Sequence, residues 1–91
     1  MRFTVEIGQI ERHVVEFNFN QLLGSLLIQV DNKPIHRMRR LFNEPIHETY
    51  HFKVGDAERT EVRIEKQRKQ LFGHRNCVYV GNRLTRIFEG I

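Results

Sequence analysis

Residues Gly24–Met38 read Gly-Ser-Leu-Leu-Ile-Gln-Val-Asp-Asn-Lys-Pro-Ile-His-Arg-Met. Leu26, Ile28 and Val30 occupy every second position, which is the period of a strand that buries one face. The Asp31-Asn32 pair that follows tolerates the positive φ angles required by a tight hairpin turn. The stretch therefore predicts a strand, a reversal at Asp31-Asn32 and a return strand.

The same alternation appears on both sides of this hairpin. Further strands are predicted at residues 3–7, 15–19, 46–54, 62–64, 76–80 and 84–88, the last two around a turn at Gly81-Asn82. Ile46, Tyr50, Phe52 and Val54 are expected to share one buried face. No segment has a sustained helical period. Residues 1–91 therefore predict an all-β fold, a single domain built as an antiparallel β-sandwich of about seven to eight short strands joined by hairpins.

Two segments fit this pattern poorly. Residues 35–42 match neither a strand nor a helix, although Pro34 before them suits the edge of a sheet because it cannot donate a ladder hydrogen bond. Lys66–Gly73 is expected to be a polar connection in which Leu71-Phe72 packs into the core.

A weak internal repeat runs through the chain. Val30-Asp31-Asn32-Lys33-Pro34 corresponds to Val80-Gly81-Asn82-Arg83-Leu84, fifty positions later. The strand before each hairpin also matches, because Val15-Glu16-Phe17 corresponds to Val62-Arg63-Ile64, forty-seven positions later. Two interpretations stay open at this point: a pseudo-twofold pair of similar halves, or convergent hairpin chemistry.

Composition narrows the class of protein. The 91 residues are 40% hydrophobic and 29% charged, which suits a folded chain. No apolar run approaches the ~20 residues of a membrane-spanning helix, so no membrane partner is expected. The lone Cys77 excludes an internal disulfide framework, favours a cytoplasmic location, and is expected to be a buried structural residue rather than a redox-sensing thiol.

One motif suggests metal chemistry. Residues His47-Glu48-Thr49-Tyr50-His51 match H-E-x-x-H, the zinc-protease signature. That chemistry requires a helix, because residues four apart on a strand are separated by roughly 13 Å. The inward parity of Tyr50 and Phe52 favours a strand with two solvent-facing histidines. We expect no catalytic, cofactor-binding or metal-binding residues, and hence no enzyme.

Basic residues form the candidate interaction surface. The net charge is +4, which permits binding to nucleic acid or other anions but also suits a simply solvated face. A nucleic-acid surface would use Tyr50 or Phe42 as a stacking platform and would draw on later basic residues such as Lys66. The surface is predicted to comprise Lys33, His36, Arg37, Arg39, Arg40, His47 and His51.

The order of these features resembles the Fas apoptotic inhibitory molecule family. The similar marks are Phe3-Thr4-Val5-Glu6-Ile7, Val15-Glu16-Phe17, Gly24 through Lys33, Leu41-Phe42, Phe52-Lys53-Val54-Gly55, Val62-x-Ile64, Phe72 and Tyr79 through Leu84. The resemblance covers nearly the whole chain. It implies a compact β-sandwich without catalytic residues, and a role in cell survival through protein contacts, including protection of other proteins under stress.

Two function classes follow. The first is a non-enzymatic protein-interaction module similar to that family, with a protein partner and a monomeric or weakly homodimeric state. The alternative is a small basic β-domain that binds nucleic acid or another anionic ligand through the same arginines.

Overall fold

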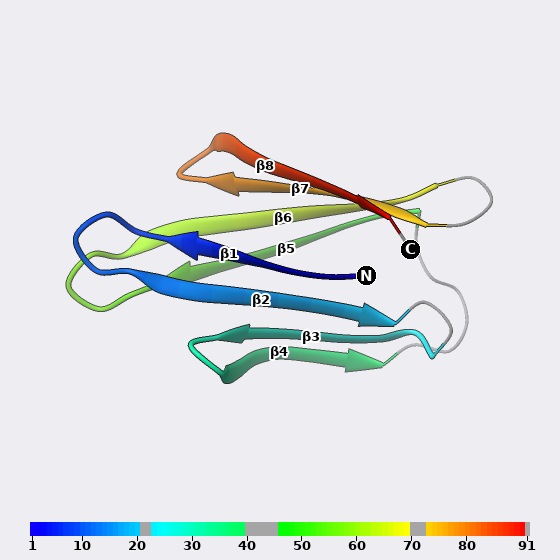
Figure 1. Cartoon of the computed structure of the whole chain (residues 1–91), viewed down its shortest axis with the longest axis horizontal. Coiled ribbons are helices and arrows are strands. Elements are labelled where there is room, and N and C mark those ends of the chain that lie inside the picture. Colours follow the sequence, from blue (N-terminus) through cyan, green and yellow to red (C-terminus); the bar gives the residue numbers. More distant parts are fainter. Residues whose placement is uncertain (21–22, 40–45, 70–72, 91) are drawn as a thin grey trace.

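The computed structural model describes residues 1–20, 23–39, 46–69 and 73–90, and all of its regular structure is β (Figure 1). The strands are β1 (Arg2–Ile7), β2 (His13–Asn20), β3 (Ser25–Val30), β4 (Lys33–Arg39), β5 (His47–Val54), β6 (Thr60–Arg68), β7 (His74–Val80) and β8 (Arg83–Gly90). The prediction of an all-β fold is confirmed. No helix among these residues is long and apolar enough to cross a membrane.

The strands form two four-stranded antiparallel sheets, with strand orders β1-β2-β3-β4 and β5-β6-β7-β8. Each strand pairs with its neighbour in sequence, so each sheet is a meander. The β3–β4 and β7–β8 pairs are joined by tight turns because glycine, asparagine or aspartate supplies a positive φ there: Asp31 and Asn32 have φ values of 51° and 67°, and Gly81 and Asn82 have 56° and 65°. Both predicted hairpin turns are confirmed.

The core lies between the sheets and consists of the alternating residues. Phe17 and Ile28 of the first sheet and Ile64 of the second are fully buried. The ring of Phe3 stacks between Phe17, at a centroid distance of 4.7 Å, and Phe88 of β8, at 4.1 Å. These contacts join the two sheets into one antiparallel sandwich, as the alternation predicted.

The two halves of the chain have equivalent frameworks. Both last hairpins carry a register shift at matching places, Ile28/Gln29 and Val78/Tyr79. The hairpin turn hydrogen-bonds to the second strand in the same way in each half: the Asp31 N–H donates to Val14 O and the Gly81 N–H donates to Glu61 O, both at 2.9 Å. The strand order, the register shift and this hydrogen bond are therefore repeated between the halves, which favours an internal repeat over convergent hairpin chemistry.

The predicted return strand is confirmed as β4. Residues 35–39 of the segment that matched neither a strand nor a helix belong to it, and their period is obscured by the bulge and by exposure along nearly the whole strand; residues 40–42 lie outside the described residues. Two local expectations are wrong. Ile46 does not share the buried face, because its side chain is 63% exposed. Residues from Lys66 to Arg68 continue β6 rather than starting a polar connection; Leu71-Phe72 lies outside the described residues.

Lys66 is buried in the core, so it does not belong to a basic surface. It is only 1% exposed, and its Nζ lies 3.5 Å from the centroid of the Phe19 ring and 4.0 Å from Glu48 Oε1. The aromatic ring and the carboxylate compensate the ammonium charge, while the aliphatic stem packs as a hydrocarbon. His74 and Asn76 of β7 are buried beside it in the same sheet.

We expect Lys66→Ala to lower the free energy of unfolding by about 3 kcal/mol, because it removes the buried stem together with the contacts of the ammonium group to the Phe19 ring and Glu48. Lys66→Met keeps the stem and should lose less. Urea denaturation measures both, with Lys53→Ala on the exposed side of β5 as a control expected to stay within about 0.5 kcal/mol of wild type. A Lys66→Ala variant as stable as the control would contradict the assigned role.

Candidate functional site

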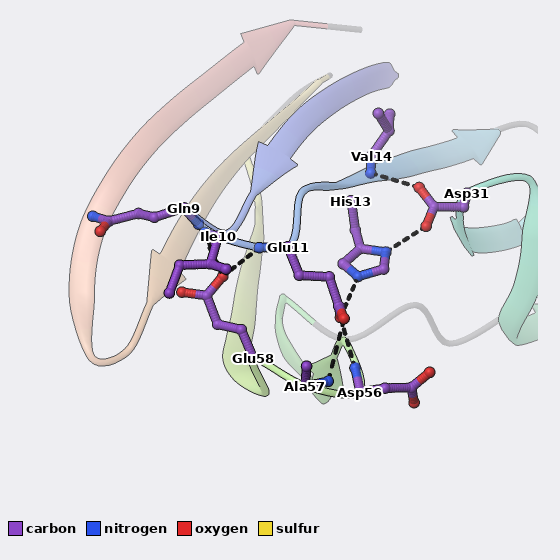
Figure 2. Close-up of polar contacts among 9 residues, drawn as sticks. All are labelled: Gln9, Ile10, Glu11, His13, Val14, Asp31, Asp56, Ala57 and Glu58. Carbon is purple, nitrogen blue, oxygen red and sulfur yellow. Dashed lines mark hydrogen bonds and ion pairs between the residues drawn. The ribbon is translucent and has the colours of Figure 1, made fainter.

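The most highly organised polar site lies where the β1–β2 and β5–β6 turns meet (Figure 2). Glu58 from the second turn reaches across to the first. Its Oε1 accepts hydrogen bonds from the backbone N–H groups of Gln9, Ile10 and Glu11, each at 3.0 Å. Three donors converging on one carboxylate favour its ionised form, and they lower the pKa of Glu58, the Glu11 N–H contributing most.

Glu11 of the first turn binds the backbone of the second turn in the same way. Its Oε2 accepts from the Asp56 N–H at 2.7 Å, and its Oε1 accepts from the Ala57 N–H at 3.2 Å. The hydrogen bond from His13 is the main cause of the lowered pKa of Glu11, followed by these two backbone bonds. Each turn is thus capped by a carboxylate from the other sheet.

Glycine makes this reciprocal capping sterically possible. Gly8 and Gly55 both have a φ of 101°, which side-chain-bearing residues rarely adopt. A Cβ atom at Gly8 would lie 2.0 Å from Glu11 O, and one at Gly55 would lie 2.1 Å from Glu58 O. The carbonyl of each capping glutamate therefore folds against a glycine of its own turn.

His13 extends the site in the first half only. Its Nε2 lies 2.7 Å from Glu11 Oε2, and its Nδ1 forms a short hydrogen bond to Asp31 Oδ2. Asp31 Oδ1 in turn accepts from the Val14 N–H at 2.9 Å, which is the main cause of the lowered pKa of Asp31. We call Glu11, His13, Asp31 and Glu58 the carboxylate–histidine cluster.

The cluster stabilises a protonated imidazole. The hydrogen bonds to Asp31 and then to Glu11 raise the pKa of His13 above its ordinary value. A neutral imidazole has only one N–H donor, whereas the imidazolium donates from both nitrogens, so two carboxylate partners select the charged form. With both nitrogens engaged, His13 is arranged to retain a proton and to fasten the β3–β4 hairpin to the turns.

The predicted interaction surface follows β4. Lys33, His36, Arg37 and Arg39 are all exposed on this strand. Arg37 and Arg39 pair with Leu27 and Ser25, so they point away from the core, whereas the ring of His36 turns toward Tyr50 of β5 with a centroid distance of 5.4 Å. Arg40 lies outside the described residues.

A hollow of about 350 Å³ lies beside these arginines on the outer face of the first sheet. Its polar lining includes Arg37, Arg39, Asn18, Asn20 and Ser25. Guanidinium, amide and hydroxyl groups are the donors that bind oxyanions. The hollow therefore has the donor groups that an anion would need.

The two histidines of the H-E-x-x-H motif lie on a strand, as predicted. His47 and His51 are exposed on the outer face of β5, and the estimated separation of roughly 13 Å is too large for a shared metal ion. His51 and His36 line one cleft of about 240 Å³ between β5 and β4, which also contains Ile35 and Lys53. His47 lies apart from that cleft, 3.9 Å from Glu65.

The expected inward position of Tyr50 is confirmed: it is 5% exposed and its hydroxyl donates to Glu48 at 2.5 Å, so it is not placed as the stacking platform that the nucleic-acid alternative would use. Phe42 lies outside the described residues. The expectation of a buried Cys77 is wrong. Cys77 is half-buried rather than buried, because it lies between the inward-facing Asn76 and Val78 and therefore points outward.

The sequence analysis did not identify the carboxylate–histidine cluster. One signal was present: Ile7-Gly8-Gln9-Ile10-Glu11 and Val54-Gly55-Asp56-Ala57-Glu58 share the pattern apolar-Gly-x-x-Glu at the same spacing of forty-seven as the strand repeat. Glycine and glutamate kept together at that spacing indicate a shared turn geometry rather than chance.

Comparison with family models, curated proteins and solved structures gave no match. The function of the chain must therefore be inferred from its own side chains.

We expect Gly8→Ala and Gly55→Ala each to lower the free energy of unfolding by about 2–3 kcal/mol, because each forces a strained φ and a clash with a carbonyl. Gly81→Ala is the matched control: φ is also positive there, but a Cβ would meet nothing within 4 Å. It should cost about 1 kcal/mol. Equal losses in all three variants, measured by urea denaturation, would refute the steric argument.

The pH dependence of stability should reveal His13. Because its pKa is raised on folding, the stability that its protonated form contributes is complete below about pH 6.5 and is lost as the pH rises through the folded pKa. The thermal midpoint of wild type should therefore exceed that of His13→Gln most clearly at mildly acidic pH, and the difference should shrink at higher pH.

The lowered pKa values of Glu11, Asp31 and Glu58 have the opposite effect on the pH dependence of stability. The stability that these ionised carboxylates contribute is complete above about pH 4.5 and is lost on further acidification.

An NMR titration of the His13 ring gives the direct test. The pKa of His13 should fall in both Asp31→Asn and Glu11→Gln, since each removes one carboxylate partner. An unchanged pKa in Asp31→Asn would show that the short hydrogen bond does not hold the proton.

Proposed function

We propose that this chain is a non-enzymatic protein-interaction module that binds an extended, acidic segment of a partner protein along β4. The observation that carries the proposal is the character of this strand. Over its seven residues every charged side chain is basic, and β4 pairs only with β3 among the described strands. An open, cationic strand edge suits an acidic segment.

The open edge supplies the main-chain part of binding. A strand at the end of a sheet presents N–H and C=O groups that an added strand can pair with, and such pairing recurs in peptide recognition. Pro34 lacks an N–H, so it limits pairing at the start of β4. The stretch from Ile35 to Arg39 is therefore the segment available for an added strand.

The basic residues around β4 supply the specificity for an acidic peptide. Arg37 and Arg39 extend outward from β4, while His51 and Lys53 lie across the cleft that separates β4 from β5. A carboxylate-rich segment lying along β4 would have cations on both sides of its backbone. Complementary charge of this kind speeds association and rejects basic competitors.

The resemblance to the Fas apoptotic inhibitory molecule family supports the same function class. It extends the proposal to a cytoplasmic role in cell survival through protein contacts, including protection of other proteins under stress. A monomer, or a homodimer formed weakly through an open strand edge, is compatible with such a role.

A second candidate function is binding of nucleic acid or another anionic ligand. The hollow beside Arg37 and Arg39, with its amide and hydroxyl groups from Asn18, Asn20 and Ser25, favours it. This site would engage phosphates through the side chains of the sheet face and would not require the open edge of β4.

A peptide titration followed by amide NMR tests the proposal. The probe is a ten-residue peptide of alternating glutamate and valine, which is acidic and prone to extend. We expect shifts concentrated in β4, binding that weakens with added salt, and at least a tenfold loss in Arg37→Glu/Arg39→Glu. Arg12→Glu, an exposed charge reversal on the β1–β2 turn, is the control that should retain binding.

A single-stranded oligonucleotide run in parallel separates the two candidates. Saturable binding of the oligonucleotide together with no response to the peptide would replace the proposed function by the second candidate. Peptide binding that is equally strong in Arg37→Glu/Arg39→Glu would refute the assignment of β4 as the binding edge.

A further inference from the structure

The equivalent frameworks of the two halves carry different side chains at one place. In the first half, the imidazole of His13 and the carboxylate of Asp31 fill the space between Glu11 and the β3–β4 turn (Figure 2). The positions equivalent to His13 and Asp31 in the second half are Thr60 and Gly81. A small hydroxyl residue and a residue without a side chain thus replace an imidazole and a carboxylate.

The second half has a cavity at this place. It has a volume of about 470 Å³, and its lining includes Gly8, Glu58, Thr60, Gly81, Arg83 and Thr85. We call it the Gly81 pocket. A Cβ atom added at Gly81 would meet nothing within 4 Å, which confirms that open space lies over this residue. The volume is in the range of small-molecule sites.

The groups that hold His13 and Asp31 in the first half have counterparts at the pocket. Glu58 corresponds to Glu11, the carboxylate that accepts from the imidazole. The backbone N–H groups of the β1–β2 turn all donate to Glu58 Oε1, and Figure 2 shows Oε2 outside these bonds. Arg83 corresponds to Lys33, the cation beside Asp31. The pocket therefore offers an acceptor for a cation and a cation for a carboxylate.

The backbone supplies a further donor. The Val14 N–H binds the Asp31 carboxylate in the first half, and Val14 O accepts from the Asp31 N–H. Glu61 O accepts from the Gly81 N–H in the same way, and in an antiparallel strand the N–H and C=O of one residue point to the same neighbour. The Glu61 N–H is thus directed at the β7–β8 turn, where Gly81 has no side chain to accept from it.

We propose that the Gly81 pocket binds a small zwitterion that replaces the missing imidazole and carboxylate. Its cationic N–H group donates to Glu58 Oε2, as His13 donates to Glu11. Its carboxylate accepts from the Glu61 N–H and pairs with Arg83, as Asp31 accepts from Val14 and lies next to Lys33. The ligand class is a small molecule that carries a protonated nitrogen heterocycle and a carboxylate.

An NMR titration of the whole chain with imidazole-4-acetate at mildly acidic pH tests the proposal, because this probe contains the two groups of His13 and Asp31 and little else. We expect saturable shifts of the amides of Thr60, Glu61 and Gly81, with a dissociation constant on the order of millimolar. Imidazole alone and acetate alone should each bind at least tenfold more weakly.

A variant that rebuilds the first-half cluster gives the decisive comparison. Gly81→Asp, alone or with Thr60→His, should fill the pocket and reduce binding at least tenfold; aspartate is tolerated at this backbone conformation, as the φ of 51° at Asp31 shows. In the double variant the introduced imidazole should also show a raised pKa by NMR. Asn82→Asp, which adds the same charge one residue away, is the matched control and should bind as wild type does.

Two results would overturn the proposal. One is the absence of saturable shifts at Thr60, Glu61 and Gly81 at probe concentrations well above millimolar. The other is unchanged binding in Gly81→Asp, whose dispersed amide spectrum would report that it is folded. Neither result depends on β4, so the outcome is independent of the acidic-peptide experiment.

Discussion

The reciprocal capping of two turns by glutamate carboxylates fixes how the two sheets of this sandwich are positioned relative to each other. Glu58 accepts from three backbone N–H groups of the first sheet's turn, and Glu11 accepts from two of the second's. In the described strands every ladder stays within one sheet, so the sheets are connected by the hydrophobic core and by side-chain bonds, of which these five are the most concentrated. A hydrophobic core alone is non-directional, whereas hydrogen bonds to ionised carboxylates specify position.

Equivalent backbone positions in the two halves hold side chains of different chemical type. At the turn end, the first half holds His13 and Asp31 where the second has Thr60 and Gly81. Deeper in the sandwich the charged residue belongs to the second half instead. Phe19 of the first half corresponds to the buried Lys66 of the second, and the two side chains are in contact. The strands and turns are thus repeated between the halves, whereas the candidate sites lie at equivalent positions whose side chains differ.

The sequence predicted the architecture well because strand period, turn chemistry and burial are local properties. Leu26 and Ile28 alternate, and Asp31-Asn32 tolerates a positive φ whatever lies elsewhere in the chain. β4 was harder to predict, because a bulged edge strand has neither a buried face nor an unbroken period.

The cluster and the buried lysine depend on distant partners, which explains why they were missed. Lysine is ordinarily a surface residue, and nothing near Lys66 in the sequence indicates the Phe19 ring that covers it. Glu11 and Glu58 look like turn residues until the two turns are known to meet. Only their shared spacing from a preceding glycine connected them.

The separation of the two sheets has a consequence for assembly. Each sheet is formed by one half of the chain, and each carboxylate cap between the sheets runs from the side chain of one turn to the backbone of the other. Two chains that exchanged halves would recreate all these bonds between molecules, with Glu11 of one copy capping the second turn of the other. An exchange of halves between two chains would therefore cost the fold none of these carboxylate caps.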